Sequence, residues 1–369
     1  MTWNSWNDTH GIGKVMSILR RCVSVFRLVR PLILAPAVVS EMATAAAQPV
    51  HVLEPVRRIG VLEGPEPQMF GRIIDVAADV QGNLFVLEAS TPEIRWFDST
   101  GAFRGTGGRK GRGPGELLQP VSLLVAANGR VFVLDARNRR ISEYVLASSR
   151  LAHVRDVRLA HRATGFCVLG EHVFTVGAPD EKDLIQEISP AGKVIASFGT
   201  REQPSRELVE RLGAKAAQTL RAEFNVATLY CDAPSKRLIV LYSSAPFVRA
   251  YSPDGTLLWS KELRDFHYPE PGVAHEGTLA WSYSGTGLWS GGKSVFMDQN
   301  QHVFVAIVVT QSRGEGWADM RVLASNDGME IERFKGQEVF ATHAGDYVYG
   351  YRQNPFPQVV QYKLRHSHR

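Results

Sequence analysis

A glycine-rich segment of the chain carries several cations. Five glycines occur between residues 107 and 116. The basic residues that we assign as ligand-binding candidates are Arg109, Lys110 and Arg112 in this segment, with Arg137 and Arg139 further along. The segment lacks the Ser or Thr that follows the lysine of a phosphate-binding loop. These cations could attract a carboxylate or a sulfate, and the alternative is a charged loop that is simply solvated.

A second group of candidates is aromatic and lies in a segment rich in Gly and Ser. The aromatic ligand-binding candidates are Trp281, Tyr283 and Trp289, with His267, Tyr268 and His275 nearby. Aromatic side chains on polar loops suit stacking on a sugar ring or on a peptide side chain, because they bury a large area with few rotatable bonds. The alternative is that these side chains only anchor a long loop to the rest of the fold.

The elements that would position these residues follow a repeating pattern from residue 70 onward. Each unit contains an apolar run, a tight polar turn, a run of β-branched and aromatic residues, and a further strand before a turn with Gly. The apolar runs of the first two units are Ile73 to Ala78, Leu84 to Leu87, Ile94 to Phe97, Leu123 to Ala126, Val131 to Leu134 and Ile141 to Leu146. A unit of four strands that recurs about every 40 to 50 residues is typical of a β-propeller.

The first turn of the unit can be counted along the chain. It recurs as Gln81-Gly82, Asn128-Gly129, Gly170-Glu171, Ser235-Lys236, Asn300-Gln301 and Gly345-Asp346. A second turn recurs with a glycine at its end, as in Ser252-Pro253-Asp254-Gly255, because hairpin turns often require a positive φ. We therefore predict an all-β fold, a six-bladed β-propeller of four-stranded antiparallel blades.

The two ends of the repeat complement each other. The last unit stops after the run Val359 to Leu364, one strand short, and the run Val56 to Leu62 precedes the first unit. We expect the N-terminal strand to lie on the outside of the sixth blade. This pairing closes the ring and hides a strand edge that would otherwise invite aggregation.

One segment of the second unit carries a family resemblance. The run Asp135-Ala136-Arg137-Asn138-Arg139-Arg140-Ile141 follows the pattern D-x-x-N-x-R-I, and Gly113-Pro114-Gly115-Glu116 with Pro120 is similar to a linker between NHL blades. The chain thus resembles the NHL-repeat-like bacterial six-bladed β-propellers, most closely over residues 70 to 146. In the first unit, Glu88 and Arg95 take the places of the acid and arginine. We expect each acid to pair with its arginine and so fix the loop between them.

Catalytic families exist among six-bladed propellers, including metal-dependent lactonases and the amidating lyase of the NHL group. Both need ligands that converge on the central channel. The isolated channel candidates are Asp75, Asn225, Glu338 and His343, and the sequence contains no H-E-x-x-H, no G-x-S-x-G and no clustered His and Cys spacing. We therefore assign no catalytic residue, no metal ligand and no cofactor, and we expect His302 and His343 to lie within packed blades.

The geometry of a four-stranded blade sorts the loops onto two faces of the ring. The first-to-second and third-to-fourth turns lie on one face, here named the turn face. The second-to-third loops and the linkers between blades lie on the other, here named the linker face. Two linkers are long, near residues 200–225 and 264–293, and long loops often carry function. We expect Arg109, Arg221 and Trp289 to surround one channel mouth on the linker face.

The first long linker has a helical pattern. The apolar residues at helical spacing are Leu208, Leu212, Ala216 and Leu220. Ser205 precedes them and can accept a hydrogen bond from the first turn of a helix. The pattern predicts a short amphipathic helix that begins after Ser205.

Residues 1–47 differ from the rest of the chain. A basic stretch precedes the apolar run Pro31 to Val39 and the run Ala45-Ala46-Ala47, which predicts a secretory leader cleaved after Ala47. The alternative is an uncleaved N-terminal anchor. The leader holds five basic and two acidic residues, so its removal lowers the formal net charge from +5 to +2. A nearly neutral chain gains little from attraction to nucleic acid.

Two cysteines remain after the leader, Cys167 and Cys231, each in an expected strand. They are either two buried thiols or a disulfide formed in an oxidising compartment. The sequence leaves both possibilities open.

These observations predict that residues 48–369 form a single exported domain, periplasmic or secreted. We expect it to bind a ligand or partner on the linker face without catalysis. The partner classes are a protein, a peptide or a carbohydrate, and we expect neither nucleic-acid binding nor a membrane span in the mature chain. The alternative function is a metal-dependent hydrolase or lyase with a divalent metal in the central channel.

Overall fold

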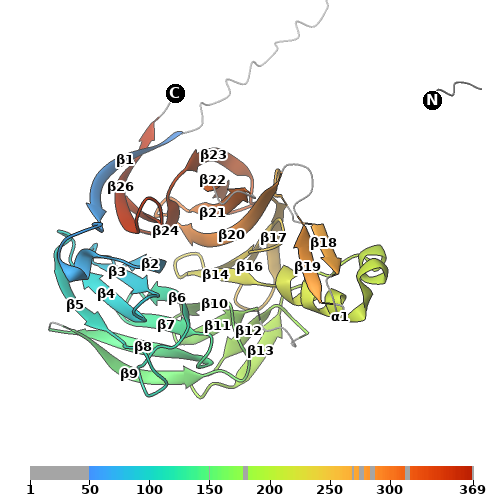
Figure 1. Cartoon of the computed structure of the whole chain (residues 1–369), viewed down its shortest axis with the longest axis horizontal. Helices are drawn as coiled ribbons and strands as arrows, with labels where there is room; N and C mark the ends of the chain where they lie inside the picture. Colours follow the sequence, from blue (N-terminus) through green and yellow to red (C-terminus); the bar gives the residue numbers. More distant parts are fainter. Residues whose placement is uncertain are drawn as a thin grey trace, which may run out of the picture. The chain divides into compact units, whose positions relative to one another are not determined.

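The computed structural model describes residues 50–148, 150–177, 182–267, 270–273, 278–282, 287–311 and 316–367. Within these residues, six antiparallel four-stranded sheets form a six-bladed β-propeller. Figure 1 shows the six sheets arranged around a common centre. The expected leader lies outside the described residues.

The first three blades follow the chain from the innermost to the outermost strand. Blade 1 contains β2 (Ile73–Ala78), β3 (Leu84–Glu88), β4 (Glu93–Phe97) and β5 (Phe103–Gly107). Blade 2 contains β6 (Pro120–Val125), β7 (Val131–Asp135), β8 (Arg140–Ala147) and β9 (Arg150–Arg158). Blade 3 contains β10 (Gly165–Leu169), β11 (His172–Val176), β12 (Ile185–Ile188) and β13 (Val194–Phe198). Strands β3 and β7 are buried along their whole length, which explains why they are apolar on both faces.

The other three blades complete the ring. Blade 4 contains β14 (Ala227–Asp232), β15 (Arg237–Tyr242), β16 (Phe247–Tyr251) and β17 (Leu257–Glu262). Blade 5 contains β20 (Leu288–Met297), β21 (His302–Gln311), β22 (Gly316–Ala324) and β23 (Glu330–Gly336). Blade 6 contains β24 (Val339–Ala344), β25 (Tyr347–Arg352), β26 (Gln358–Ser367) and β1 (Val50–Ile59). The first strands of adjacent blades contact one another, for example β2 with β24, so these strands line the centre.

Blade 6 closes the ring with both ends of the described chain. Strand β1 pairs antiparallel with β26, from Val50 opposite Ser367 to Ile59 opposite Val359. The predicted closure is therefore confirmed. The strand begins earlier than the expected run Val56 to Leu62 and ends at Ile59, because Gly60 has a φ of 124° that an extended strand does not allow. In Figure 1 the two strands lie side by side at the edge of the ring.

A buried arginine in blade 2 holds the linker that precedes the blade. Arg140 donates to the carbonyl of Gly113 at 2.6 Å and to the carbonyl of Glu116. The expected direct pair of Arg140 with Asp135 is wrong, because Arg140 forms its ion pair with Asp156 at 3.1 Å. The Asp135 carboxylate instead accepts hydrogen bonds from the linker, including one from the Leu118 N–H at 2.6 Å. Both side chains fix the linker, each by its own bonds.

Arginines of blades 1, 4 and 5 hold the linkers before those blades in the same way. In blade 1, Arg95 donates to the carbonyl of Met69 at 2.8 Å, just after the short 3-10 helix η1 (Glu66–Gln68), and Glu88 accepts the N–H of Arg72. The expected pair of Glu88 with Arg95 is likewise wrong, because Arg95 forms ion pairs with Glu93 and Glu66. The corresponding bonds in blades 4 and 5 are Arg249 to the carbonyl of Thr200 and Arg321 to the carbonyl of Arg264.

A disulfide joins the innermost strands of blades 3 and 4. Cys167 of β10 and Cys231 of β14 are bonded, and their Cα atoms are 5.5 Å apart. Cys167 is fully buried. Of the two possibilities left open by the sequence, the structure has the disulfide.

The two long linkers pack against each other. Helix α1 (Arg206–Phe224) begins after Ser205, whose hydroxyl accepts a hydrogen bond from the Leu208 N–H at 3.2 Å, as the sequence predicted. The second linker forms a hairpin of β18 (Glu270–Val273) and β19 (Leu279–Ser282). Leu212 and Leu220 of the helix are buried against Leu279 of the hairpin. Within the described residues, no helix is both long and apolar enough to cross a membrane.

Candidate functional site

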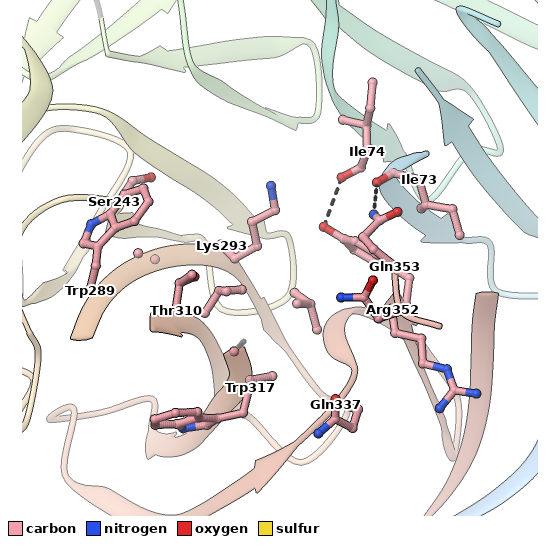
Figure 2. Close-up of a pocket in the computed structure, with 18 of the residues that line it drawn as sticks. Ile73, Ile74, Ser243, Trp289, Lys293, Thr310, Trp317, Gln337, Arg352 and Gln353 are labelled. Atoms are coloured by element: carbon pink, nitrogen blue, oxygen red, sulfur yellow. Dashed lines mark hydrogen bonds between the residues drawn. The ribbon is translucent and has the colours of Figure 1, made fainter. Parts of the chain in front are cut away.

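A cavity of about 560 Å³ opens among blades 4, 5, 6 and 1. It is lined by the start of β2, the loop after β15, the first half of β20, the end of β21, the start of β22 and the end of β25. Each of these segments is at the end of its strand that joins a linker or a second-to-third loop. The cavity therefore lies on the linker face, and Figure 2 shows its lining.

A lysine lines this cavity and interacts electrostatically with a buried carboxyl group. Lys293 projects into the hollow from β20, at the β-bulge between Gly292 and Ser294. Loss of surrounding water lowers the pKa of Lys293, and the charge of Asp75 opposes this effect. Burial raises the pKa of Asp75 to about 6, against hydrogen bonds from the N–H groups of Leu123 and Val76. The charge of each group favours the ionised form of the other.

Two arginines add positive charge to the cavity lining. Arg72 lines the cavity and is exposed, and it forms no salt bridge with a described residue. Arg352 also lines it and is 3.6 Å from the Glu338 carboxylate. The described residues that line the cavity thus include three cations and no carboxylate, so the site carries a net positive charge and favours an anion.

Aromatic rings contribute to the apolar part of the lining, beside aliphatic side chains such as Val308 and Val339. Trp289 is 41% exposed. Trp317 is half-buried, and the Lys335 ammonium lies 4.9 Å from its ring centroid. Tyr351 is buried and its hydroxyl donates to the Ile74 carbonyl at 3.0 Å. Such rings offer flat surfaces for a ligand, because a large apolar area is presented with few rotors to freeze.

Hydrogen bonds hold the rim of the cavity in place before any ligand arrives. The Gln353 amide donates to the carbonyl of Ile73 at 2.6 Å, so it bridges blades 6 and 1. Arg352 donates to the side-chain oxygen of Gln358. A site held in this way loses little conformational entropy on binding.

The five basic residues proposed from the sequence do not line this cavity. Arg109 is 81% exposed at its side chain and pairs with Glu116 at 2.8 Å. Lys110 and Arg112 belong to the same linker, between blades 1 and 2. The two in the following loop, Arg137 and Arg139, are exposed. These residues form a charged surface beside blade 2.

The aromatic candidates separate in the structure. Trp289 lines the cavity. The side chain of Trp281 and the whole of Tyr283 lie outside the described residues, as do Tyr268 and His275. Figure 1 shows α1 and the β18–β19 hairpin beside blade 4, at the edge of the ring and away from its centre. The second insertion reaches the cavity through its last residues, such as Trp289, which belong to the start of β20.

Two of the isolated candidates for the channel have structural partners. Asn225 follows the last residue of α1 and is buried. Its side chain exchanges two hydrogen bonds of 2.9 Å with the backbone of Glu202. His343 stacks on Phe296 with ring centroids 6.1 Å apart, and burial lowers its pKa. Their side chains are engaged in packing the fold.

Sequence reasoning missed Lys293, Arg72 and Trp317 as lining residues. One signal could have pointed to Lys293, which follows two glycines within a strand. A Cβ atom on Gly292 would lie 2.3 Å from the carbonyl oxygen of Tyr242, so this strand needs glycine where the blades approach closely. Glycine inside a strand often marks a bulge, and bulges re-aim side chains near sites.

Comparison with known proteins supports the fold. A family model described as a 6-bladed beta-propeller, DUF5128, matches residues 52–170. No curated protein matches the chain. A member of the DUF4221 family from Bacteroides vulgatus is 10% identical over 86% of this chain and 99% of its own, with a TM-score of 0.56. A protein of Bacteroides fragilis described as exported is 10% identical over 86% of this chain and 95% of its own, with a TM-score of 0.54.

Proposed function

We propose that this protein is an extracytoplasmic, noncatalytic binding propeller that takes an acidic ligand with a flat apolar group in its linker-face cavity. The observation that carries the proposal is the combination of Lys293 and Arg72 with the exposed ring of Trp289 in one hollow. Its volume of about 560 Å³ suits a small ligand or the side chains of a peptide. A negative group would pair with the cations while a ring stacks on the indole.

The charged surface beside blade 2 has a separate role in this proposal. Arg109, Lys110 and Arg112 are held by the linker and lie outside the cavity. Exposed charges contribute more to the rate of association than to affinity. Together with Arg137 and Arg139, they would attract an acidic ligand or partner toward the linker face.

Matched probe pairs test the charge requirement. We expect N-acetylphenylalanine to bind more tightly than its amide, and phenyl glucuronide more tightly than phenyl glucoside, in isothermal titration calorimetry. The first pair represents a peptide-like ligand and the second a carbohydrate. Equal binding of the charged and neutral member in both pairs, or binding of none of the four, would count against an acidic ligand.

Substitutions then locate the site. We expect Lys293→Gln and Trp289→Ala each to weaken binding of the preferred probe about tenfold or more, since each removes about 1.4 kcal/mol or more of contact. The control is the triple change Arg109→Ala, Lys110→Ala and Arg112→Ala. This triple variant should still bind the probe, but its binding should depend less on salt concentration. Binding that is lost in the triple variant but unchanged in the two cavity variants would move the site to blade 2.

Two features support an extracytoplasmic location. The sequence of residues 1–47 has the pattern of a secretory leader, and the disulfide between Cys167 and Cys231 is of the kind that persists in oxidising compartments. Mass measurement of the protein recovered from the producing cell should give a chain that begins at Gln48. A recovered chain that still contains residues 32–39 would contradict this location.

The linker contacts of blade 2 also support placing this propeller among the NHL-repeat-like ones. Asp135 and Arg140 stand at the motif positions, and each holds the linker before blade 2. Substitution of either residue should therefore loosen that linker, which proteolysis of the folded protein would reveal.

A further inference from the structure

A cluster of two histidines and an aspartate lies where the closing strand meets blade 5. His51 belongs to β1, Asp298 follows β20, and His302 begins β21. One ligand atom from each of the three lies within 4.8 Å of the others. The cluster is on the turn face, opposite the cavity, because it includes the turn between the first two strands of blade 5.

The distances within the cluster match the edges of a tetrahedral metal site. His51 Nε2 is 3.3 Å from His302 Nδ1, and His302 Nδ1 is 3.4 Å from Asp298 Oδ2. Ligands about 2.0–2.1 Å from a tetrahedral zinc ion are separated by about 3.3–3.4 Å. Two of the three edges therefore already have the length that a bound ion would impose.

A glutamate orients one of the rings toward the centre of the cluster. Glu332 Oε2 lies 2.6 Å from His51 Nδ1 and also accepts the His51 backbone N–H at 3.0 Å. The carboxylate thus accepts a hydrogen bond from Nδ1–H, which leaves the lone pair of Nε2 pointing at His302. Metal-binding histidines commonly have this carboxylate partner, which fixes the tautomer and the ring orientation.

One oxygen of the aspartate in the cluster is not satisfied by hydrogen bonds. Asp298 Oδ2 and His51 Nε2 both face His302 Nδ1, at 3.4 Å and 3.3 Å. Asp298 is 3% exposed, and its Oδ2 has no hydrogen-bond partner within the described part of the chain. Its other oxygen accepts the N–H groups of Asn300 and His302. A buried carboxylate oxygen without a partner costs free energy, and a cation would remove that cost.

In the equivalent turn of blade 1, hydrogen bonds satisfy both oxygens of the aspartate. There Asp79 accepts the backbone N–H groups of Gln81 and Asn83 with Oδ1, and its Oδ2 accepts the Asn83 side-chain amide at 2.7 Å. In blade 5, His302 stands in the place of Asn83, and His51 arrives from the closing strand. The exchange replaces the amide donor with two imidazole nitrogens, next to a carboxylate that both turns contain.

We propose that His51 Nε2, His302 Nδ1 and Asp298 Oδ2 bind one divalent transition-metal ion, with zinc as the preferred ion and water as the fourth ligand. Imidazole and carboxylate ligands in tetrahedral positions suit zinc. The ion adds to the Glu332 hydrogen bonds that join β1 to blade 5, whereas the backbone ladder of β1 joins it to β26. A metal that binds only the folded ring stabilises the closed form by mass action.

The test uses the full chain, purified with a tag that lacks histidine and stripped of metal by a chelator. Zinc binding is measured by titration and elemental analysis, and cobalt binding by the visible absorption of a four-coordinate ion. The informative variant is His302→Asn, which restores the turn of blade 1 and so should fold. Asp298→Asn serves as a second variant. His172→Asn is the control, because His172 is exposed and pairs with Glu187 elsewhere.

We expect one equivalent of zinc and a higher melting temperature with zinc than with chelator in the parent chain and in the control. Both effects should be lost in His302→Asn and in Asp298→Asn, along with the cobalt absorption. The chain has 11 histidines, so comparison among the variants decides the location. The proposal is overturned if the parent chain binds no zinc at about 10 μM, or if both variants bind it as the parent does.

Discussion

The arginine that holds the linker before blade 2 allows a stability test with an internal control. Arg140→Ala removes a guanidinium that is 9% exposed at its side chain. It would leave the carbonyls of Gly113 and Glu116 without this donor, and Asp156 without its arginine partner. Breaking a buried ion pair by removing one member costs about 3–5 kcal/mol. We therefore expect a loss of about 3–5 kcal/mol in the free energy of unfolding.

The control is Arg109→Ala in the same linker. Arg109 is also ion-paired, with Glu116, but its side chain is 81% exposed. Exposed pairs contribute about 0–1 kcal/mol, so this variant should lie close to the parent. The contrast isolates burial, because both changes remove an arginine that contacts the same segment.

The assay is chemical denaturation followed by tryptophan fluorescence, with thermal melting as a second measure. For a folded unit of about 320 residues, an entropy of unfolding of about 2.1 cal/mol/K per residue converts the expected loss into about 4–7 °C. A loss below about 1 kcal/mol in Arg140→Ala, or an equal loss in Arg109→Ala, would refute the reasoning from burial.

Three further predictions concern pH, the disulfide and ring closure. The folded-state pKa of Asp75 is raised from 3.8 to about 6, so its protonated form stabilises the fold at low pH and this contribution is lost as the pH rises from about 4 through about 6. Denaturation across that range should show up to about 3 kcal/mol more pH dependence in the parent than in Asp75→Asn, and parallel profiles would contradict it. Cys167→Ser should lower the free energy of unfolding by about 2–4 kcal/mol in denaturation experiments. The stability of this variant should no longer depend on a reductant, and a further loss of stability when reductant is added would argue against this disulfide. Deletion of residues 48–62 removes β1 and exposes β26, so size-exclusion chromatography should show aggregates, and a monomer with unchanged melting would disprove closure by β1.

The repeat and its closure could be predicted because their signals are local in the sequence. Apolar runs and tight turns with glycine mark strands and hairpins wherever they occur. The run at residues 56–62 precedes the first unit and is unpaired within it, and the last unit is one strand short. Counting the strands of each unit therefore predicted that this run closes the ring. The helix after Ser205 was predictable for the same reason, since its cap and its apolar spacing lie within one segment.

Partner choice within the linkers was harder to predict. The acid and arginine of the D-x-x-N-x-R-I run are close in sequence, which favoured a pair between Asp135 and Arg140. In the folded blade, linker N–H groups bind the carboxylate and Asp156 from β9 reaches the guanidinium. The sequence shows which side chains seek partners, but only the packed blade shows which partner is nearest.

The cavity and the histidine cluster depend on contacts between blades that are far apart in the chain. His51 and His302 are 251 residues apart, yet their ring nitrogens are 3.3 Å apart, because the ring brings the first strand beside the fifth blade. The cavity likewise joins Arg72 to Lys293. Repeat patterns specify each blade from its own residues, whereas a site made at the junction of blades depends on side-chain direction and depth. By itself the sequence determined a closed ring of six blades, and the tertiary structure decided which of its polar residues meet.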